Sequence, residues 1–143
     1  FIMTLDEAVG LVLYAFEHGE NGDLFIRKAP SATIKDQAEA VSDLFGADKN
    51  AVSFIGIRHG EKTYETLLTN EECAKAEDMG EFYRVPADNR GLNYDKYFAV
   101  GDKERNVLKE FNSANAKLLS VSEIKDILLS TEYVKRELEN YKK

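Results

Sequence analysis

The segment that decides the fold is residues 24–57, which read LFIRKAPSATIKDQAEAVSDLFGADKNAVSFIGI. Its first three residues, Leu24–Ile26, have the apolar character of a short buried strand. Val52–Ile57 is rich in β-branched and aromatic side chains and predicts a second strand. A helical pattern lies between these two strands. Strands that alternate with helices predict an α/β layer rather than a helical bundle.

The helix between the strands carries its own start and stop signals. Thr33 and Asp36 can cap its first turn, because a threonine hydroxyl accepts a hydrogen bond from an open backbone N–H group. Gly46 ends the helix, since glycine readily adopts the left-handed conformation that closes many helices. Its apolar positions are Ile34, Ala38, Val41, Leu44 and Phe45.

A first helix begins after Thr4, which forms a capping box with Glu7. Its apolar residues recur at helical spacing and predict one buried face: Leu5, Ala8, Val9, Val12 and Phe16. Further apolar residues widen this stripe and indicate burial on more than one side: Leu11, Leu13 and Ala15.

The pattern weakens after Ile57. We expect a short helix over Glu61–Leu68, and then another that Thr69 and Glu72 cap. A strand is predicted over Phe82–Val85, which Pro86 closes. Residues 88–102 are polar and predict irregular structure.

The C-terminal part is helical again. Ser120 and Glu123 frame one helix, and Thr131 can cap a last one over Glu132–Tyr141, whose many charges indicate a solvated face. The chain shows no repeat and no flexible linker. We therefore expect one domain over residues 1–143, with 120–143 a helical tail.

Composition excludes several classes of function. The 143 residues carry a net charge of -7, which disfavours nucleic acid as a partner because that binding rests on many cationic contacts. The single Cys73 rules out an internal disulfide and, with only two histidines, leaves too few ligands for a zinc site. It indicates a reducing, cytoplasmic environment. No stretch approaches the roughly 18–20 apolar residues of a membrane span.

The segment most able to carry chemistry is Gly56-Ile57-Arg58-His59-Gly60-Glu61-Lys62-Thr63, which directly follows the second predicted strand. Ligands of open α/β proteins bind at the carboxyl ends of strands. Arg58 offers a planar fork for phosphate oxygens and Lys62 a mobile charge, while Glu61 can accept hydrogen bonds from ribose hydroxyls. Gly60 would allow a close backbone approach.

The segment allows two other interpretations. A P-loop needs four residues between its glycines with Lys directly after the second, whereas three residues separate Gly56 from Gly60 and Glu61 precedes Lys62. We therefore reject an ATPase site. The plain alternative is that Arg58, Glu61 and Lys62 are solvated surface charges.

Several segments together resemble the C-terminal part of a known enzyme family. They are Phe1–Ala8, Lys28-Ala29-Pro30, Arg58–Lys62, Tyr83–Pro86 and Leu92-Asn93-Tyr94, with Ser113-Ala114-Asn115 matching more loosely. The family is the UDP-N-acetylglucosamine 4,6-dehydratases of capsular polysaccharide synthesis, the inverting type that also epimerises C5. It belongs to the extended short-chain dehydrogenase/reductase superfamily. The resemblance is strongest over residues 1–97 and implies a small mixed α/β substrate-binding lobe.

The resemblance also implies roles for individual residues. Arg58 matches the arginine that holds the diphosphate of the UDP-sugar, and Glu61 matches the residue that meets the ribose. Lys62 stands where a further contact to the substrate is expected. In the family an arginine that would be a second phosphate ligand stands just before the position of Phe1. The implied partners are UDP-N-acetylglucosamine and a Rossmann lobe, in a homo-oligomer of the parent enzyme.

Other features of that family are missing from this sequence. It contains no Gly-x-x-Gly-x-x-Gly or Gly-x-Gly-x-x-Gly segment, and none of the seven tyrosines has a lysine four residues later. In the family NAD or NADP takes hydride from C4 of the sugar and returns it after water leaves. We therefore expect a fragment that carries no catalytic, cofactor-binding or metal-binding residue and is inactive alone.

Three residues besides Arg58, Glu61 and Lys62 complete the predicted substrate-binding set. His59 could act as a base, but a surface role beside the phosphate-binding arginine is the stronger interpretation. Lys28 follows a strand and could face the ligand or simply be exposed. Tyr83 could stack on the substrate or belong to the core. A rival hypothesis for the whole chain is a free-standing acidic interaction module that docks through Glu132–Tyr141.

Overall fold

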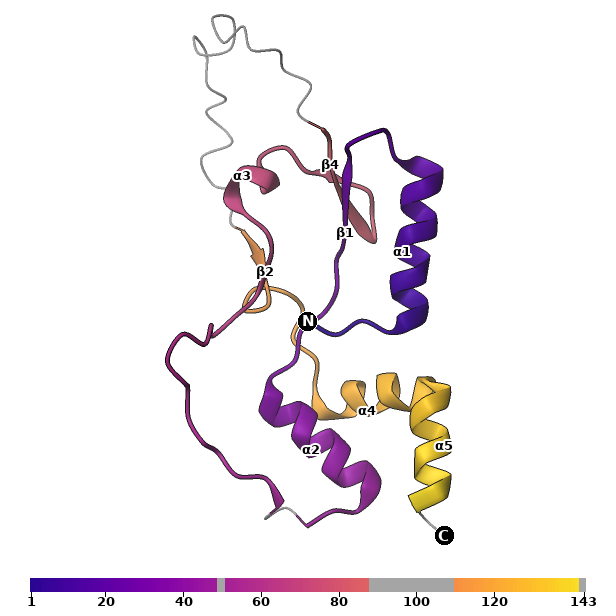
Figure 1. Cartoon of the computed structure of the whole chain (residues 1–143), viewed down its shortest axis with the longest axis vertical. Helices are drawn as coiled ribbons and strands as arrows, with labels where there is room; N and C mark the ends of the chain where they lie inside the picture. Colours follow the sequence, from indigo (N-terminus) through magenta and orange to yellow (C-terminus); the bar gives the residue numbers. More distant parts are fainter. Residues whose placement is uncertain (49–50, 88–109, 142–143) are drawn as a thin grey trace, which may run out of the picture. The chain divides into compact units, whose positions relative to one another are not determined.

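The computed structural model describes residues 1–48, 51–87 and 110–141 (Figure 1). The chain divides into two compact units. Unit 1 comprises residues 1–5, 29–65 and 113–143, and unit 2 comprises residues 6–28 and 66–112. Both units are therefore built from segments that are far apart in the sequence.

Unit 2 combines helices with two small sheets. Its elements are α1 (Leu5–His18, in unit 2 from Asp6 onward), β1 (Leu24–Arg27), β2 (Thr66–Leu68), α3 (Asn70–Cys73), β3 (Glu77–Asp78), β4 (Phe82–Val85) and β5 (Phe111–Asn112). One sheet has the order β1-β4-β3, and the other pairs β2 with β5. Every strand pair is antiparallel.

The core of unit 2 forms where these strands meet. Ile26, Leu68 and Val85 are buried together, and Leu68 has no exposed surface at all. α1 is held against β1 and β4 by Tyr14, whose ring lies 4.4 Å from Phe82 and 5.8 Å from Phe25 between centroids. Apolar burial of this kind is the main favourable contribution to folding.

Unit 1 is mostly helical. It contains α2 (Ile34–Phe45), α4 (Val121–Ser130) and α5 (Glu132–Tyr141), and its core joins Ala40 of α2 to Leu119 and Ile124. A single parallel bridge pairs Ser31 with Leu118.

Several local signals of the sequence are confirmed by the structure. Thr33 accepts a hydrogen bond from the Asp36 N–H group at 3.0 Å, and Gly46 closes α2 in the left-handed conformation with φ +63°. Complete capping boxes begin α3 and α4, at the positions expected from Thr69/Glu72 and Ser120/Glu123. The strands predicted at Leu24 and over Phe82–Val85 and the last helix are also confirmed.

The strand predicted over Val52–Ile57 is wrong. The structure assigns no strand to these residues, and Figure 1 shows them in a long trace without a partner. They make no backbone hydrogen bond to any other described residue. Their large apolar side chains are exposed, with Phe54, Ile55 and Ile57 each above 70%. A strand-forming composition gives no strand where no neighbouring backbone supplies the hydrogen bonds.

The short helix predicted over Glu61–Leu68 is also wrong. The segment begins in a turn and ends in β2, whose Thr66 and Leu68 pair with β5. The pairing partners lie more than 40 residues away in the sequence, so local spacing does not reveal them.

Five positions that the sequence predicts to be buried, four in α1 and one in α2, are exposed instead. The α1 stripe of Leu5, Val9, Val12 and Phe16 faces solvent, while the half-buried side of this helix contains Leu11, Tyr14 and Ala15. In α2, Ile34 is 80% exposed and Ala40 is the fully buried residue. Residues 88–102, including Tyr94, Tyr97 and Phe98, lie outside the described residues. Among the helices that the structure describes, none has the length and apolar composition that crossing a membrane requires.

Candidate functional site

The predicted diphosphate-binding segment forms a tight turn in unit 1. The N–H group of Glu61 donates to the carbonyl of Arg58 at 3.1 Å, and the backbone N–H of Arg58 donates to Oε2 of Glu61 at 2.8 Å. Gly60 has φ +86°, a left-handed value at the third position of the turn that L-residues avoid. The conformation of the turn therefore favours glycine at position 60. This structural reason adds to the close backbone approach to a ligand that the sequence predicts.

The side chains of Arg58 and Glu61 lie next to each other on this turn. Nε of Arg58 is 3.6 Å from Oε1 of Glu61, and the two side chains are 72% and 48% exposed. An exposed ion pair of this kind contributes little to stability, because water screens it. Both groups are thus accessible from solvent and can exchange their mutual contact for contacts to a ligand. His59 is exposed on the same turn.

Lys62 lies at the edge of a hollow in unit 1. The hollow has a volume of about 690 Å³ and is lined by residues of four separate segments: Phe1, Ala32, Thr33, Ile34, Gln37, Lys62, Thr63, Tyr64, Glu65, Ser113, Ala114 and Leu118. Nζ of Lys62 stands 4.0 Å from Oε2 of Glu65, and both side chains are mostly exposed. Arg58 and Glu61 do not line this hollow.

The lining offers several polar groups to a ligand. Besides the Lys62 ammonium it includes the hydroxyls of Thr63, Tyr64 and Ser113. A concave, partly apolar surface with a few hydrogen-bonding groups is typical of small-molecule sites. Sequence reasoning did not select these three hydroxyls as binding residues. Thr63 and Tyr64 directly follow Lys62, so adjacency was the signal that could have found them, whereas Ser113 is distant along the chain.

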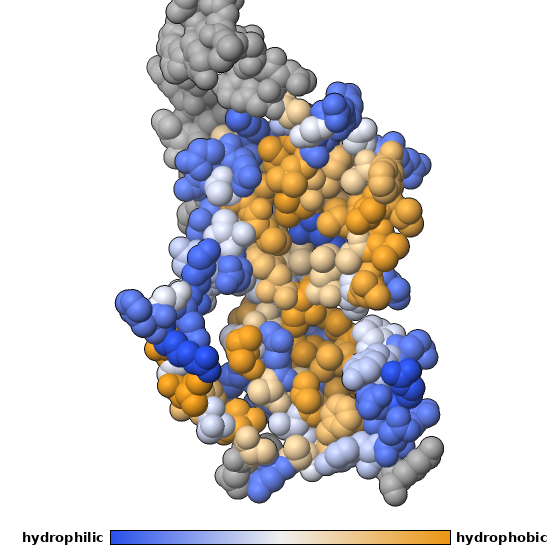
Figure 2. All heavy atoms as spheres, viewed as in Figure 1, coloured by the Kyte–Doolittle hydropathy of each residue, from blue (hydrophilic) through white to orange (hydrophobic). Residues whose placement is uncertain are grey.

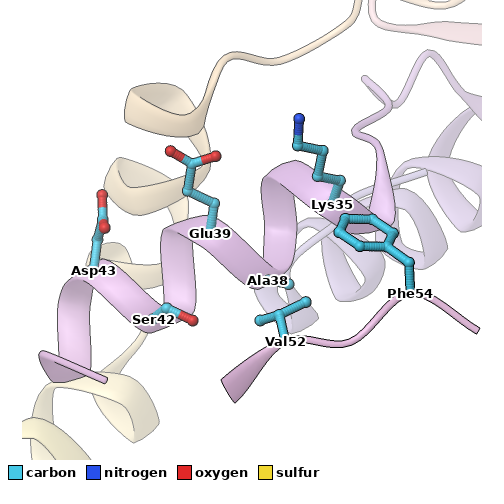
Figure 3. Close-up of a pocket in the computed structure, with 7 residues that line it drawn as sticks. All are labelled: Lys35, Ala38, Glu39, Ser42, Asp43, Val52 and Phe54. Carbon is cyan, nitrogen blue, oxygen red and sulfur yellow. The ribbon is translucent and has the colours of Figure 1, made fainter. Parts of the chain in front are cut away.

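A second hollow in unit 1 lies between α2 and residues 52–54. It measures about 240 Å³ and is lined by Lys35, Ala38, Glu39, Ser42, Asp43, Val52 and Phe54. Figure 3 shows Val52 and Phe54 beside the α2 ribbon, with Val52 close to Ala38. Asp43 is ion-paired with Lys125 of α4 at 2.6 Å. This hollow contains none of the predicted substrate-binding residues.

The other two predicted residues, Lys28 and Tyr83, lie together in unit 2. Nζ of Lys28 is 4.5 Å from the centroid of the Tyr83 ring, and it also forms an ion pair with Asp78. The hydrogen bond from Lys28, together with one from the Gly80 N–H group, lowers the pKa of Asp78. Tyr83 packs against the core of this unit, with its ring centroid 5.7 Å from that of Phe111.

The six predicted residues therefore fall into two groups. Arg58, His59, Glu61 and Lys62 are neighbours in unit 1, and Lys28 contacts Tyr83 in unit 2. In unit 2 the Lys28 ammonium contacts the Asp78 carboxylate and the Tyr83 ring, which belong to the same unit. In the part of the chain that the structure describes, no three His, Cys, Asp or Glu side chains are placed to hold a metal ion.

Comparison with known families assigns the class of the chain. Residues 1–87 match a family described as polysaccharide biosynthesis protein, and residues 88–135 match the polysaccharide biosynthesis protein C-terminal family. Because the first match covers more than half of the 143 residues, the chain belongs to the polysaccharide biosynthesis protein family.

Individual relatives refine this assignment. Proteins from Rickettsia typhi, Rickettsia felis and Rickettsia prowazekii, each named UDP-glucose 4-epimerase, are 51% identical over 140 residues. The match covers 98% of this chain and 41% of each relative. The chain thus spans about two fifths of the length of the curated relatives that it matches.

A solved structure supports the fold. The X-ray structure of Pen from Bacillus thuringiensis superposes with a TM-score of 0.69 at 25% sequence identity, over 92% of this chain and 37% of that one. The predicted fold class, a small mixed α/β lobe of the extended short-chain dehydrogenase/reductase type, is confirmed.

Proposed function

We propose that this chain is the part of a nucleotide-sugar enzyme that holds the UDP of a UDP-hexose. Family membership and the name shared by the Rickettsia relatives support a UDP-sugar as the ligand. The observation that carries the proposal is the Arg58–Glu61 turn. It holds a guanidinium and a carboxylate side by side and open to solvent.

In this proposal the Arg58 guanidinium binds the diphosphate, since its planar fork can donate two parallel hydrogen bonds to phosphate oxygens. Glu61 accepts hydrogen bonds from the ribose hydroxyls, and its contact with the Arg58 backbone fixes the distance between the two groups. Lys62 supplies a further positive charge at the edge of the 690 Å³ hollow. His59, Lys28 and Tyr83 remain candidates for secondary contacts.

Two reactions fit this role. The resemblance in the sequence favours 4,6-dehydration and C5 epimerisation of UDP-N-acetylglucosamine, whereas the relatives' name favours 4-epimerisation of UDP-glucose. Both act on a hexose attached to UDP, so one UDP-binding role serves either. Nicotinamide supplies the redox chemistry in such enzymes. This chain lacks a glycine-rich dinucleotide fingerprint, so we assign none of its residues to NAD or NADP.

Calorimetry with UDP tests the proposal on the natural gene product and on its Arg58→Ala variant. Loss of a charge-assisted contact should weaken UDP binding about tenfold or more. Arg136→Ala is the matched control, because Arg136 is an exposed cation of unit 1 on α5, outside the turn. Equal UDP affinity in the Arg58→Ala variant and the wild type would show that Arg58 does not bind the diphosphate. Mass analysis of the product then separates the reactions, since dehydration loses one water and epimerisation does not change the mass.

A further inference from the structure

The chain that leads into the Arg58–Glu61 turn contacts α2 through two side chains. The backbone of residues 52–57 makes no hydrogen bond to another described residue. Val52 and Phe54 nevertheless line the hollow of about 240 Å³ on α2, and Figure 3 shows the Phe54 ring extending from the chain toward this helix. Side-chain packing, and not strand pairing, therefore attaches this part of the chain to unit 1.

The chain that leaves the turn is attached in a different way. The Glu65 N–H group donates to the hydroxyl of Ser113 at 3.0 Å, and the Ser113 N–H group donates to the Glu65 carbonyl at 2.8 Å. We call residues 52–65 the strap. The turn that carries the predicted ligand groups lies between its two attachments, one on α2 and the other at Ser113.

The Phe54 ring lies at the mouth of the hollow. Side chains of an extended chain alternate between two sides, so Val52 and Phe54 point the same way and Ile55 points the other way. Ile55 accordingly does not line the hollow, although it is exposed to almost the same extent as Phe54, at 71% against 77%. Figure 2 shows the strap at the surface, with apolar residues beside strongly hydrophilic ones. The two residues form a matched pair that differs in contact with α2.

A glycine separates Phe54 from the turn. Gly56 has φ +76°, and a Cβ at this position would meet no atom within 4 Å. Glycine adopts positive and negative φ values about equally readily, so the backbone at position 56 can rotate at little cost. Without an attachment before this glycine, the Arg58–Glu61 turn would be held only from the side of Glu65. The contact of Phe54 with α2 limits that freedom.

We propose that Phe54 is a positioning residue, which holds the Arg58–Glu61 turn in place for its ligand through its contact with α2. The inference rests on the proposed function, because the ligand is the UDP assigned to this turn. Binding must order the groups that touch the ligand, and this ordering lowers affinity. A strap that is already held by Phe54 needs less ordering when the diphosphate arrives. Phe54 itself does not touch the ligand in this role.

A purely structural role for Phe54 leads to a different expectation. An apolar side chain stabilises a protein through the surface that it removes from water, and most of the Phe54 side chain stays in water. The core of unit 1 is formed by Ala40, Leu119 and Ile124. Substitution of Phe54 should therefore change the affinity for UDP and leave the stability of the protein almost unchanged.

Calorimetry with UDP on the natural gene product tests the inference. Phe54→Ala should weaken UDP binding about three- to tenfold, because binding must then order the freed strap. Phe54→Leu keeps an apolar side chain on the hollow and should restore most of the affinity. Ile55→Ala is the matched control and should bind UDP as the wild type does. A Phe54→Ala variant that binds UDP like Ile55→Ala overturns the inference, and so does a loss of affinity that is accompanied by a lower melting temperature.

Arg58→Ala, measured beside these variants, separates two kinds of failure. If Arg58→Ala weakens UDP binding and Phe54→Ala does not, the turn binds the diphosphate without help from Phe54, and only the positioning role is wrong. If Arg58→Ala has no effect, the proposed function is wrong, and the positioning role fails with it.

Trypsin measures the effect of Phe54 on the turn without any nucleotide. The protease cuts after Arg58, which is 72% exposed, and such cleavage is favoured where the backbone is mobile. Phe54→Ala should raise the rate of cleavage between Arg58 and His59 severalfold above that of Ile55→Ala, whereas Phe54→Leu should not. Mass spectrometry of the fragments identifies the bond. Equal rates for Phe54→Ala and Ile55→Ala would show that Phe54 does not restrain the turn, whatever the result with UDP.

Discussion

The Arg84 guanidinium donates to Oδ2 of Asp23 at 2.7 Å and thereby joins β4 to the turn that precedes β1. The Asp23 side chain is only 3% exposed, and it also accepts hydrogen bonds from the N–H groups of Glu20 and Ala87. The Glu20 N–H and the Arg84 guanidinium, in that order, lower the pKa of Asp23. The Asp23 carboxylate therefore connects the turn before β1 to strand β4 and to Ala87, which follows β4.

Substitution of Asp23 should consequently destabilise unit 2. Asp23→Asn keeps the shape but replaces one acceptor oxygen by an NH₂ group that faces other donors. We expect a clear fall in the urea midpoint. The control is Glu77→Gln, because the Glu77 carboxylate also pairs with Arg84, at 3.4 Å, but is half exposed. Equal midpoints for the two variants would show that Asp23 has no special role.

The glycines at positions 10 and 46 should respond in opposite ways to alanine. A Cβ at either position meets no atom within 4 Å, so packing does not distinguish them. Gly10 lies inside α1, and Gly10→Ala should stabilise the protein by about 1 kcal/mol through helix propensity. Gly46 has φ +63°, and Gly46→Ala should cost about 1–2 kcal/mol because L-residues avoid this conformation. Urea unfolding measures both, and effects of the same sign would refute the backbone explanation.

The adjacent leucines of β2 provide a test of the core of unit 2. Leu68 has no exposed surface, and Leu68→Ala should lower the free energy of unfolding by about 2–5 kcal/mol through lost burial and a cavity. Leu67 is 38% exposed, and Leu67→Ala should cost about 1 kcal/mol or less. Comparable losses for both variants in denaturant unfolding would mean that the burial of β2 differs from that described.

The pH dependence of stability should include a contribution from Glu123. A hydrogen bond from Lys117 is the largest cause that lowers its pKa from 4.5 to about 2, and the N–H and hydroxyl groups of Ser120 add to it. Since the folded state binds this proton less readily than the unfolded state, the contribution is complete above pH 4.5 and is lost as pH falls toward 2.

Glu123→Gln should therefore reduce the loss of stability on acidification over this range, although it also removes the capping carboxylate at neutral pH. Unfolding measured as a function of pH gives the difference in slope between the variant and the wild type. Glu139→Gln, at an exposed position of α5, is the control. A Glu123→Gln slope that matches the wild type would contradict the expected proton linkage, as would a Glu123 titration by NMR near 4.5.

Features with a local cause could be predicted from the sequence. The caps at Thr33, Thr69 and Ser120 each depend on residues within one turn, and all three are present. Gly46 ends α2 for an equally local reason. The strand over Phe82–Val85 was also predicted, although its pairing with β1 was not.

Features that depend on distant partners could not be predicted in the same way. Val52–Ile57 has a strand composition, yet composition does not provide the neighbouring backbone that a strand needs. Periodicity identified the apolar faces of α1 but not which of them the described chain would cover. The site is similar: the Arg58–Glu61 turn follows from adjacent residues, whereas the hollow beside Lys62 is assembled from four separate segments.

The interleaving of the two units has a consequence for synthesis. The backbone passes between units 1 and 2 four times, at residues 5–6, 28–29, 65–66 and 112–113. α2 emerges from the ribosome long before α4. Ile124 of α4 packs with Ala40 of α2 in the core of unit 1. The core of unit 1 around Ala40 therefore cannot form until α4 has been translated. Contacts between residues so far apart in the sequence slow folding. A nascent chain whose apolar core residues are still exposed is expected to need a chaperone that shields them.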